Sequence, residues 1–285
     1  TELSDLANYK AIKREPVCTT YRNVWVCGMG PPSSGGIAVA QSLGILENFD
    51  LSASQYLPTV VNSEGGKPSV AAVHLISESQ RLAYADRNKY VADTDFVPLP
   101  GNGVSSMLAK DYLKTRAALI STTKSMGTAQ AGVFSSAQAL LGSSAAEGKG
   151  TTHMSIVDKY GNALVMTTTI ESGMGSYHFT RGFLLNNQLT DFSFDPSDAS
   201  GLIANRIGPL KRPRSSMAPT LVFAKAADGS RGDFVMATGS PGGATIIQFV
   251  VKTVVSALDW KLDAQQATSM VNFGAANSAT TGVGG

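Results

Sequence analysis

The chain changes character abruptly at Thr151. Residues 121–150 are mainly Ser, Thr, Ala and Gly and carry few charges, a composition that favours a flexible tail with one short helix around residues 135–141. From Thr151 onward, β-branched residues alternate along the chain and predict strands. A loose tail that runs directly into a strand marks a junction, so we expect two regions, residues 1–150 and residues 151–285.

The segments 153–158 and 163–170 predict a β-hairpin. The connection between them contains a glycine and an asparagine, which suit the dihedral angles of a tight turn. In such a hairpin, Thr151 begins the first strand and Thr169 lies near the far end of the second strand. We therefore expect the hydroxyls of the two threonines to meet.

Thr151 has two interpretations. Threonine is simply a good strand residue, and the residues alone favour this interpretation. Alternatively, cleavage of the Gly150–Thr151 bond would create an α-amino group beside the Thr151 hydroxyl, where the amine can serve as the general base of a nucleophile. Gly150 has no Cβ atom to obstruct attack on its carbonyl carbon.

The composition permits one large domain or two small ones, because 43% of the 285 residues are apolar. A formal net charge of +2, from 23 basic and 21 acidic residues, gives no electrostatic reason to expect nucleic acid or an anionic membrane as a partner. No apolar run is long enough to span a membrane. The three histidines, His74, His153 and His178, are scattered along the chain, so we expect no metal site.

The two cysteines bracket a segment that predicts a hairpin turning at Arg22 and Asn23. Counting outward from that turn, Cys18 faces Cys27 at a spacing that permits a cross-strand disulfide. Two free thiols, packed as small hydrophobic side chains, are an equal alternative. A disulfide would favour export to the periplasm or the exterior.

Apolar spacing and turn residues predict further elements. A third hairpin is expected from residues 217–224 and 233–238. Helices are expected at residues 1–12, 37–46, 69–88, 105–119 and 246–258, with a last short helix that ends near residue 271. The adjacent Asp86 and Arg87, near the end of the long helix 69–88, are interpreted as a solvated or structural ion pair.

A glycine pair, Gly242 and Gly243, lies between a predicted strand and the apolar helix 246–258. Glycines at such a junction expose backbone N–H groups at a helix N-terminus, an arrangement that can hold an anion or an oxyanion. A turn that merely needs glycine is the alternative, and the local sequence favours it.

Six motifs occur in order along the chain. They are Leu6-Ala7-Asn8-Tyr9-Lys10, Pro31-Pro32-Ser33-Ser34-Gly35-Gly36, Thr151-Thr152-His153, Leu184-Leu185-Asn186-Asn187-Gln188 followed by Asp191-Phe192, Lys211-Arg212-Pro213-Arg214-Ser215-Ser216-Met217, and Gly239-Ser240-Pro241-Gly242-Gly243. Together these motifs resemble the γ-glutamyltransferase family. The resemblance covers nearly the whole chain: residues 1–150 are similar to the later part of the family's large subunit, and residues 151–285 to its small subunit.

This resemblance implies an α+β fold, the αββα four-layer sandwich of the N-terminal nucleophile hydrolases, with two packed β-sheets flanked by helices. It implies a zymogen that cleaves itself at Gly150–Thr151 into large and small subunits. The implied activity is that of a γ-glutamyltransferase or glutathione hydrolase. The γ-glutamyl group of glutathione or a related amide would pass to water or an acceptor amine through a γ-glutamyl-threonine ester. No cofactor is implied, and a periplasmic or secreted location is expected.

The resemblance also implies the roles of individual residues. Thr151 would be the nucleophile, and the Thr169 hydroxyl would orient it. The remaining implied roles are oxyanion stabilisation by the backbone N–H groups of Gly242 and Gly243, binding of the donor's α-carboxylate by Ser215 and Ser216, and binding of its α-ammonium group by Gln188 and Asp191.

Two departures from the family pattern suggest alternatives. Glu171 stands where the transferases have an asparagine that contacts the donor, and the resulting pattern is similar to the acylase-like branch of the family. The second hypothesis is therefore an acylase that acts on a non-glutamyl amide, such as a cephalosporin side chain. The first part of the family's large subunit, which contributes an arginine to the donor carboxylate, has no counterpart here. The third hypothesis is a truncated, unprocessed homologue without activity.

Overall fold

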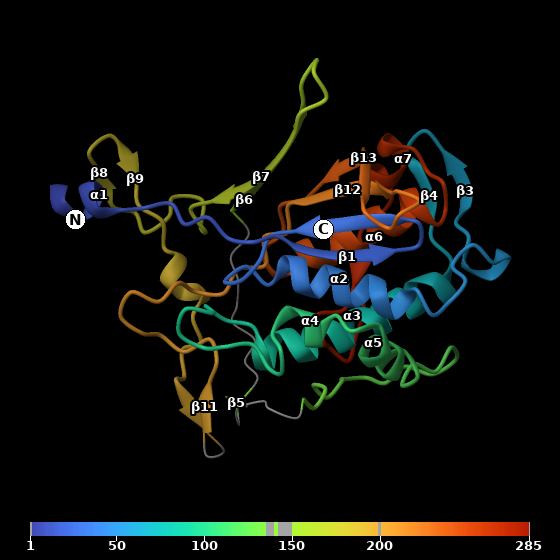
Figure 1. Cartoon of the computed structure of the whole chain (residues 1–285), viewed down its shortest axis with the longest axis horizontal. Helices are drawn as coiled ribbons and strands as arrows, with labels where there is room; N and C mark the ends of the chain where they lie inside the picture. Colours follow the sequence, from blue (N-terminus) through green and yellow to red (C-terminus); the bar gives the residue numbers. More distant parts are fainter. Residues whose placement is uncertain (1, 135–139, 142–149, 199–200, 285) are drawn as a thin grey trace.

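The main sheet joins strands from both predicted regions. The computed structural model describes residues 2–134, 140–141, 150–198 and 201–284. In this structure the largest sheet has four antiparallel strands in the order β1-β2-β12-β13, so that β2 pairs with β12 across the junction (Figure 1). The strands are β1 (Val17–Tyr21), β2 (Val24–Gly28), β12 (Thr220–Lys225) and β13 (Arg231–Thr238).

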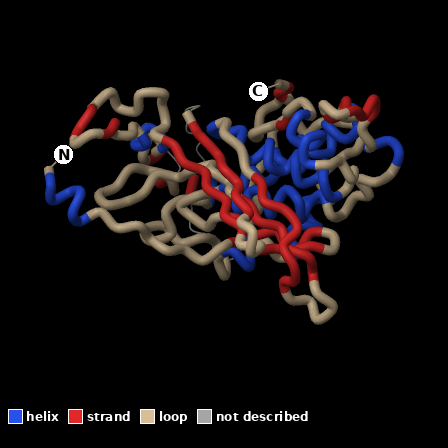
Figure 2. Tube along the Cα trace, turned by 90° about the horizontal axis from the view of Figure 1, so that it is seen from above, coloured by secondary structure: helices blue, strands red, loops and turns tan. Residues whose placement is uncertain are grey.

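Three helices build the core beneath this sheet. The helices α2 (Gly35–Leu46) and α6 (Ile246–Leu258) pack on the sheet, and α3 (Val70–Tyr90) packs on α2. Every residue of α2 is buried, as expected of a helix with few polar residues. Figure 2 shows the strands as a band across the molecule, with most of the helical turns to one side of it. The core therefore contains residues from both sides of the junction.

The structure is a mixture of helix and sheet, but the four-layer sandwich is not confirmed. The strands β6 (Thr151–Val157) and β7 (Ala163–Thr169) form a separate two-stranded sheet, whose turn projects away from the body of the molecule (Figure 1). Several apolar side chains of this hairpin are partly exposed, including those of Met154, Ile156 and Leu164. The hairpin contacts the main sheet along β13.

Most of the predicted helices and all three predicted hairpins are confirmed. The helix expected at residues 105–119 is wrong: it is divided into α4 (Val104–Met107) and α5 (Lys110–Ala117), because the backbone leaves the helical conformation at Leu108 and Ala109. The other elements are α1 (Leu3–Asn8), η1 (Ser54–Tyr56), β3 (Thr59–Asn62), β4 (Gly65–Lys67), β5 (Leu140–Leu141), β8 (Phe179–Thr180), β9 (Phe183–Leu184), η2 (Gln188–Asp191), β10 (Ser197–Asp198), β11 (Gly201–Ile203), η3 (Gly243–Thr245), α7 (Ala264–Ser269), β14 (Phe273–Gly274) and β15 (Gly282–Val283).

The first part of the predicted tail, residues 121–134, contains no helix or strand but is held on α3 by hydrogen bonds. The Tyr90 hydroxyl donates to the Gly132 carbonyl at 2.7 Å, and the Gly132 N–H donates to the Asp86 carboxylate at 2.7 Å. The short helix expected around residues 135–141 lies outside the described residues, apart from the two residues of β5.

The prediction that Asp86 and Arg87 form an ion pair is wrong. Asp86 instead pairs with Arg116 at 3.2 Å, and Arg87 donates hydrogen bonds to the hydroxyls of Ser34 and Ser216. Burial raises the pKa of the Asp86 carboxyl, an effect that the positive charge of Arg116 opposes. Because consecutive side chains point in different directions around a helix, the two neighbours serve separate buried networks.

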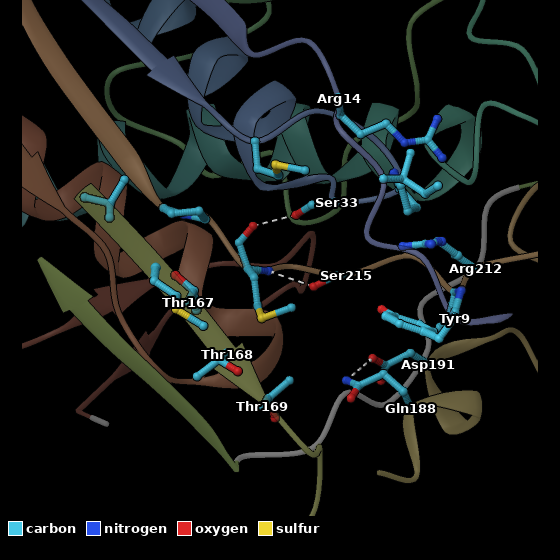
Figure 3. Close-up of a pocket in the computed structure, with 18 residues that line it drawn as sticks. Tyr9, Arg14, Ser33, Thr167, Thr168, Thr169, Gln188, Asp191, Arg212 and Ser215 are labelled. Atoms are coloured by element: carbon cyan, nitrogen blue, oxygen red, sulfur yellow. Dashed lines mark hydrogen bonds between the residues drawn. The ribbon is translucent and has the colours of Figure 1, made fainter. Parts of the chain in front are cut away.

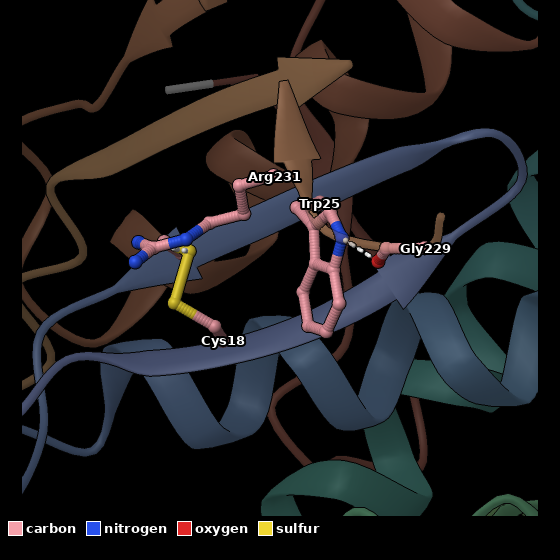
Figure 4. Close-up of a disulfide and its surroundings, with 5 residues drawn as sticks. Cys18, Trp25, Gly229 and Arg231 are labelled. Carbon is pink, nitrogen blue, oxygen red and sulfur yellow. Dashed lines mark hydrogen bonds between the residues drawn. A yellow bond between two sulfur atoms is a disulfide. The ribbon is translucent and has the colours of Figure 1, made fainter. Parts of the chain in front are cut away.

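The hairpin of β1 and β2 carries a disulfide. Cys18 lies opposite Cys27 in the strand register, as predicted, and their sulfur atoms are bonded. Figure 4 shows this bond beside Arg231 on one face of the sheet, where the Trp25 indole N–H also donates to the Gly229 carbonyl at 3.0 Å. The structure therefore adopts the disulfide rather than the alternative of two free thiols.

Removing the disulfide by the double substitution Cys18→Ser and Cys27→Ser should destabilise the protein by about 2–3 kcal/mol, because a cross-link over a loop of this length restricts the unfolded chain. Urea unfolding of the variant and of the oxidised parent measures the difference. Dithiothreitol should shift the parent toward the variant and leave the variant unchanged. An equal midpoint for the variant and the oxidised parent would contradict this expectation.

Candidate active site

The two threonines singled out by the sequence lie opposite each other. Thr151 and Thr169 are paired at the open end of the β6–β7 hairpin. The Thr169 hydroxyl donates a hydrogen bond to the Gly150 carbonyl oxygen at 3.1 Å and accepts one from the Glu171 N–H at 2.7 Å. The single proton of the Thr169 hydroxyl is thus directed at the carbonyl of the predicted cleavage bond.

Gly150 is held close to the neighbouring chain. Its N–H donates to the Glu171 carbonyl oxygen at 2.9 Å. A Cβ atom at position 150 would lie 2.2 Å from the same oxygen, a distance that no real contact permits. The sequence suggested that glycine leaves the Gly150 carbonyl open to attack, and the structure adds that glycine is needed for this close approach.

Two carboxylates share one amide beside the threonines. The Gln188 amide nitrogen donates to the Glu171 carboxylate at 2.7 Å and to the Asp191 carboxylate at 3.2 Å. Both carboxylates are buried, and Glu171 has a positive φ of 76°, a conformation that residues other than glycine rarely adopt. The arrangement concentrates negative charge at one end of the site, where a ligand cation would be favoured.

The serine pair is anchored by the first part of the chain. Ser33 and Ser215 form a parallel β-bridge, in which the Ser34 N–H donates to the Ser215 carbonyl at 2.7 Å. The Ser33 hydroxyl donates to the Met217 carbonyl, and the Met217 N–H donates to the Ser215 hydroxyl at 3.1 Å. Ser215 and Met217 are therefore positioned by a turn that lies some 180 residues earlier in the chain.

The glycine pair forms the turn before α6. Gly242 and Gly243 both have positive φ values, 138° and 55°. Within the described part of the chain, neither backbone N–H donates a hydrogen bond to another protein group. Two such groups at one turn can accept a ligand anion.

The predicted site residues meet in one small pocket. Its volume is about 10 Å³, which is room for a single water molecule. Gly242, although predicted as a site residue, does not line it. Met217 and Ile246 form an apolar wall that the sequence did not indicate. The predicted residues that line the pocket are Thr151, Thr169, Glu171, Gln188, Asp191, Ser215, Ser216 and Gly243.

A larger cavity of about 500 Å³ adjoins this pocket, since Thr169, Gln188 and Asp191 line both. Figure 3 shows Arg14 and Arg212 on the opposite side of the cavity from the β7 threonines. A volume of this size is typical of sites for small molecules.

His153 supports the hairpin from β6. Its imidazole contacts the Thr167 hydroxyl at 2.8 Å and the Ser155 hydroxyl at 3.0 Å, and a Cβ atom on Gly239 would lie 2.1 Å from the ring. Partial burial lowers the pKa of this imidazole.

The described ranges contain no cluster of three His, Cys, Asp or Glu side chains that could hold a metal ion, and no helix in them is long and apolar enough to cross a membrane.

Comparison with known proteins gives consistent matches. A family model described as Gamma-glutamyltranspeptidase matches residues 1–281. The chain is 39% identical over 276 residues to the glutathione hydrolase proenzyme of Escherichia coli (strain K12), covering 94% of this chain and 43% of that protein. It is 32% identical over 266 residues to the Acylase ACY 1 proenzyme of Pseudomonas sp. (strain V22), covering 93% of this chain and 41% of that protein. The chain thus spans less than half the length of these relatives.

The fold is also similar to a solved structure. The cephalosporin acylase from Bacillus halodurans matches with a TM-score of 0.68 at 20% identity, covering 95% of this chain and 42% of that chain. At this identity the match concerns the fold alone.

The turn at Gly242 should tolerate no side chain. In Gly242→Ala, the new Cβ atom would lie 2.8 Å from the Phe249 ring and 2.9 Å from the Thr245 hydroxyl, on a backbone that favours glycine. Gly229→Ala is the matched control, because its φ is also positive, at 85°, but its nearest neighbour is the end of a lysine side chain at 4.0 Å. We expect a loss of about 1–2 kcal/mol of unfolding free energy for Gly229→Ala and a larger loss for Gly242→Ala. Equal losses in urea unfolding would refute the crowding at Gly242.

Proposed function

Because the chain belongs to the gamma-glutamyltranspeptidase family, we propose that it cleaves its own Gly150–Thr151 bond. We further propose that it then transfers a γ-glutamyl group from glutathione or a related amide to water or an amine. The observation that carries this proposal is the hydrogen bond from the Thr169 hydroxyl to the Gly150 carbonyl, with Thr151 directly opposite in the strand register.

Self-cleavage begins with attack of the Thr151 hydroxyl oxygen on the Gly150 carbonyl carbon. The acyl group moves from nitrogen to oxygen, and the hydroxyl proton ends on the released amine. The Thr169 hydroxyl stabilises the negative charge that develops on the carbonyl oxygen. Water then hydrolyses the ester, which leaves a carboxylate on Gly150 and a free α-amino group on Thr151.

In the processed protein the same threonine attacks the donor. The α-amino group of Thr151 accepts the hydroxyl proton and returns it to the leaving amine. The backbone N–H groups of Gly243 and its neighbour Gly242 stabilise the tetrahedral oxyanion, an interaction that typically contributes about 3 kcal/mol per donor. Support comes from the position of Gly243 on the same pocket as Thr151.

Charge distinguishes the two ends of the donor. Glu171 and Asp191 bind its α-ammonium group, because two buried carboxylates around one amide favour a cation. Ser215 and Ser216 bind its α-carboxylate. This distribution supports a γ-glutamyl donor over a glutaryl donor, because the glutaryl group has no ammonium group for the two carboxylates to bind.

The two products of cleavage stay together as large and small subunits. The strand β2, from the first part of the chain, pairs with β12 from the second, and α2 packs against α6. The disulfide between Cys18 and Cys27 supports a location in an oxidising compartment, the periplasm or the exterior.

Thr169→Val should slow self-cleavage about 10²–10³-fold, because valine preserves the shape of threonine but cannot donate to the carbonyl oxygen. The rate at which the Gly150-ended and Thr151-started fragments form, followed by mass spectrometry, measures this effect. Thr169→Ser is the matched control and should cleave at close to the parental rate. Cleavage of the valine variant at the parental rate would exclude the proposed role of the hydroxyl.

The processed protein should hydrolyse γ-glutamyl-p-nitroanilide faster than glutaryl-p-nitroanilide. Glu171→Gln should reduce this preference about tenfold, because it removes one of two charges around the ammonium group but keeps an oxygen acceptor for Gln188. Asp228→Asn, in the turn between β12 and β13, is the control and should leave the preference unchanged. A parent that prefers the glutaryl amide would instead support an acylase.

A further inference from the structure

We propose that Arg87 is a positioning residue for donor recognition, although it belongs to the long helix α3 and does not line the pocket. In this inference, Arg87 sets the Ser216 hydroxyl so that its proton points to the α-carboxylate of the donor. The inference rests on the proposed function, because it concerns the donor-binding end of the same site.

Arg87 connects α3 to both segments that carry the serines. Its Nε atom donates to the Ser34 hydroxyl at 2.8 Å, and one terminal nitrogen donates to the Ser216 hydroxyl. The Ser34 hydroxyl in turn donates to the Ser215 carbonyl oxygen at 2.7 Å. Arg87, Ser34 and Ser216 are each at most 2% exposed. An arginine side chain loses less conformational entropy per hydrogen bond when its planar guanidinium donates to two acceptors at once.

These bonds determine where the hydroxyl protons go. A guanidinium has donors but no acceptor, so Ser216 can only accept from Arg87 and must direct its own proton elsewhere. The Ser215 hydroxyl is in the same state, because it accepts from the Met217 N–H at 3.1 Å. Among the described residues, no protein group accepts a hydrogen bond from either serine hydroxyl.

The pocket therefore receives two O–H donors from adjacent residues, since Ser215 and Ser216 both line it. Two parallel donors match the two oxygens of a carboxylate. A hydroxyl that already accepts from a cation is polarised, which strengthens the bond that it donates to an anion. Arg87 thus favours a donor with an α-carboxylate over a donor without one.

The connection also crosses the proposed cleavage site. Arg87 precedes Gly150 in the chain and Ser216 follows Thr151, so that after cleavage one subunit would prepare the binding group of the other. Asp86, the neighbour of Arg87 on α3, takes no part, because its carboxylate is bound to Arg116 and the backbone of Gly132.

The test compares two donors in the processed protein. The donor γ-glutamyl-p-nitroanilide carries the α-carboxylate, and 4-aminobutyryl-p-nitroanilide is the same donor without it. In Arg87→Met, kcat/KM for the γ-glutamyl donor should fall about tenfold to a hundredfold, mainly through KM, while kcat/KM for the 4-aminobutyryl donor changes less than threefold. Adding Ser216→Ala to Arg87→Met should lower kcat/KM for the γ-glutamyl donor only slightly further, because both changes affect the same hydroxyl.

Arg81→Met is the matched control for a merely structural effect. Arg81 is equally buried on α3, where it pairs with Glu78 at 2.6 Å, away from the serines. This variant should affect both donors equally. Arg87→Lys keeps a cation but cannot bridge Ser34 and Ser216 from one planar group. In this variant kcat/KM should fall for the γ-glutamyl donor only, and by less than in Arg87→Met. Equal losses for both donors in either Arg87 variant would overturn the inference.

Calorimetry with L-glutamate and 4-aminobutyrate gives a readout that needs no turnover. The parent should bind L-glutamate more tightly than 4-aminobutyrate, and the Arg87 variants should lose that difference. A parent that fails to hydrolyse γ-glutamyl amides but shows this pattern would refute the proposed function and support the role of Arg87. A parent that binds both compounds equally would overturn the inference, whatever it hydrolyses.

Discussion

The pairing of β2 with β12 is the constraint on which the rest of the structure depends. In this antiparallel register Gly28, the last residue of β2, lies opposite Thr220, the first residue of β12. The segment that leaves β2 and the segment that enters β12 must therefore run side by side. This places Ser33 beside Ser215, and it is why two distant parts of the chain together position the segment that carries the two serines.

The same pairing explains how the proposed self-cleavage would leave the site intact. The junction at Thr151 lies at the end of a peripheral hairpin, whereas the buried contacts of α2, α6 and the main sheet join the two regions elsewhere. Apolar burial is the dominant stabilising term in folded proteins. The proposed cleavage at the junction would consequently free one α-amino group beside Thr169 without removing the interactions that hold the core.

Local patterns predicted much of the structure. Counting residues from a turn was sufficient to pair Cys18 with Cys27, because strand register follows from the turn. Placing Thr151 and Thr169 at the open end of one hairpin was sufficient to bring them together. The helix over residues 105–119 failed, since apolar spacing does not reveal where a chain must bend to pack. The contacts of Arg87 could not be predicted, because they depend on how α3 lies against the segment after β2. The same limit applies to the crowding of Gly150 by the Glu171 carbonyl.

The most direct test of the account is the intact mass of freshly purified protein, measured beside a Thr151→Ala control under denaturing conditions. We expect two polypeptides from the parent, separated between Gly150 and Thr151, and one uncut polypeptide from the control. That result would identify Thr151 as the nucleophile of its own processing. A single uncut polypeptide from both proteins would contradict the account and indicate an unprocessed homologue with an inherited site.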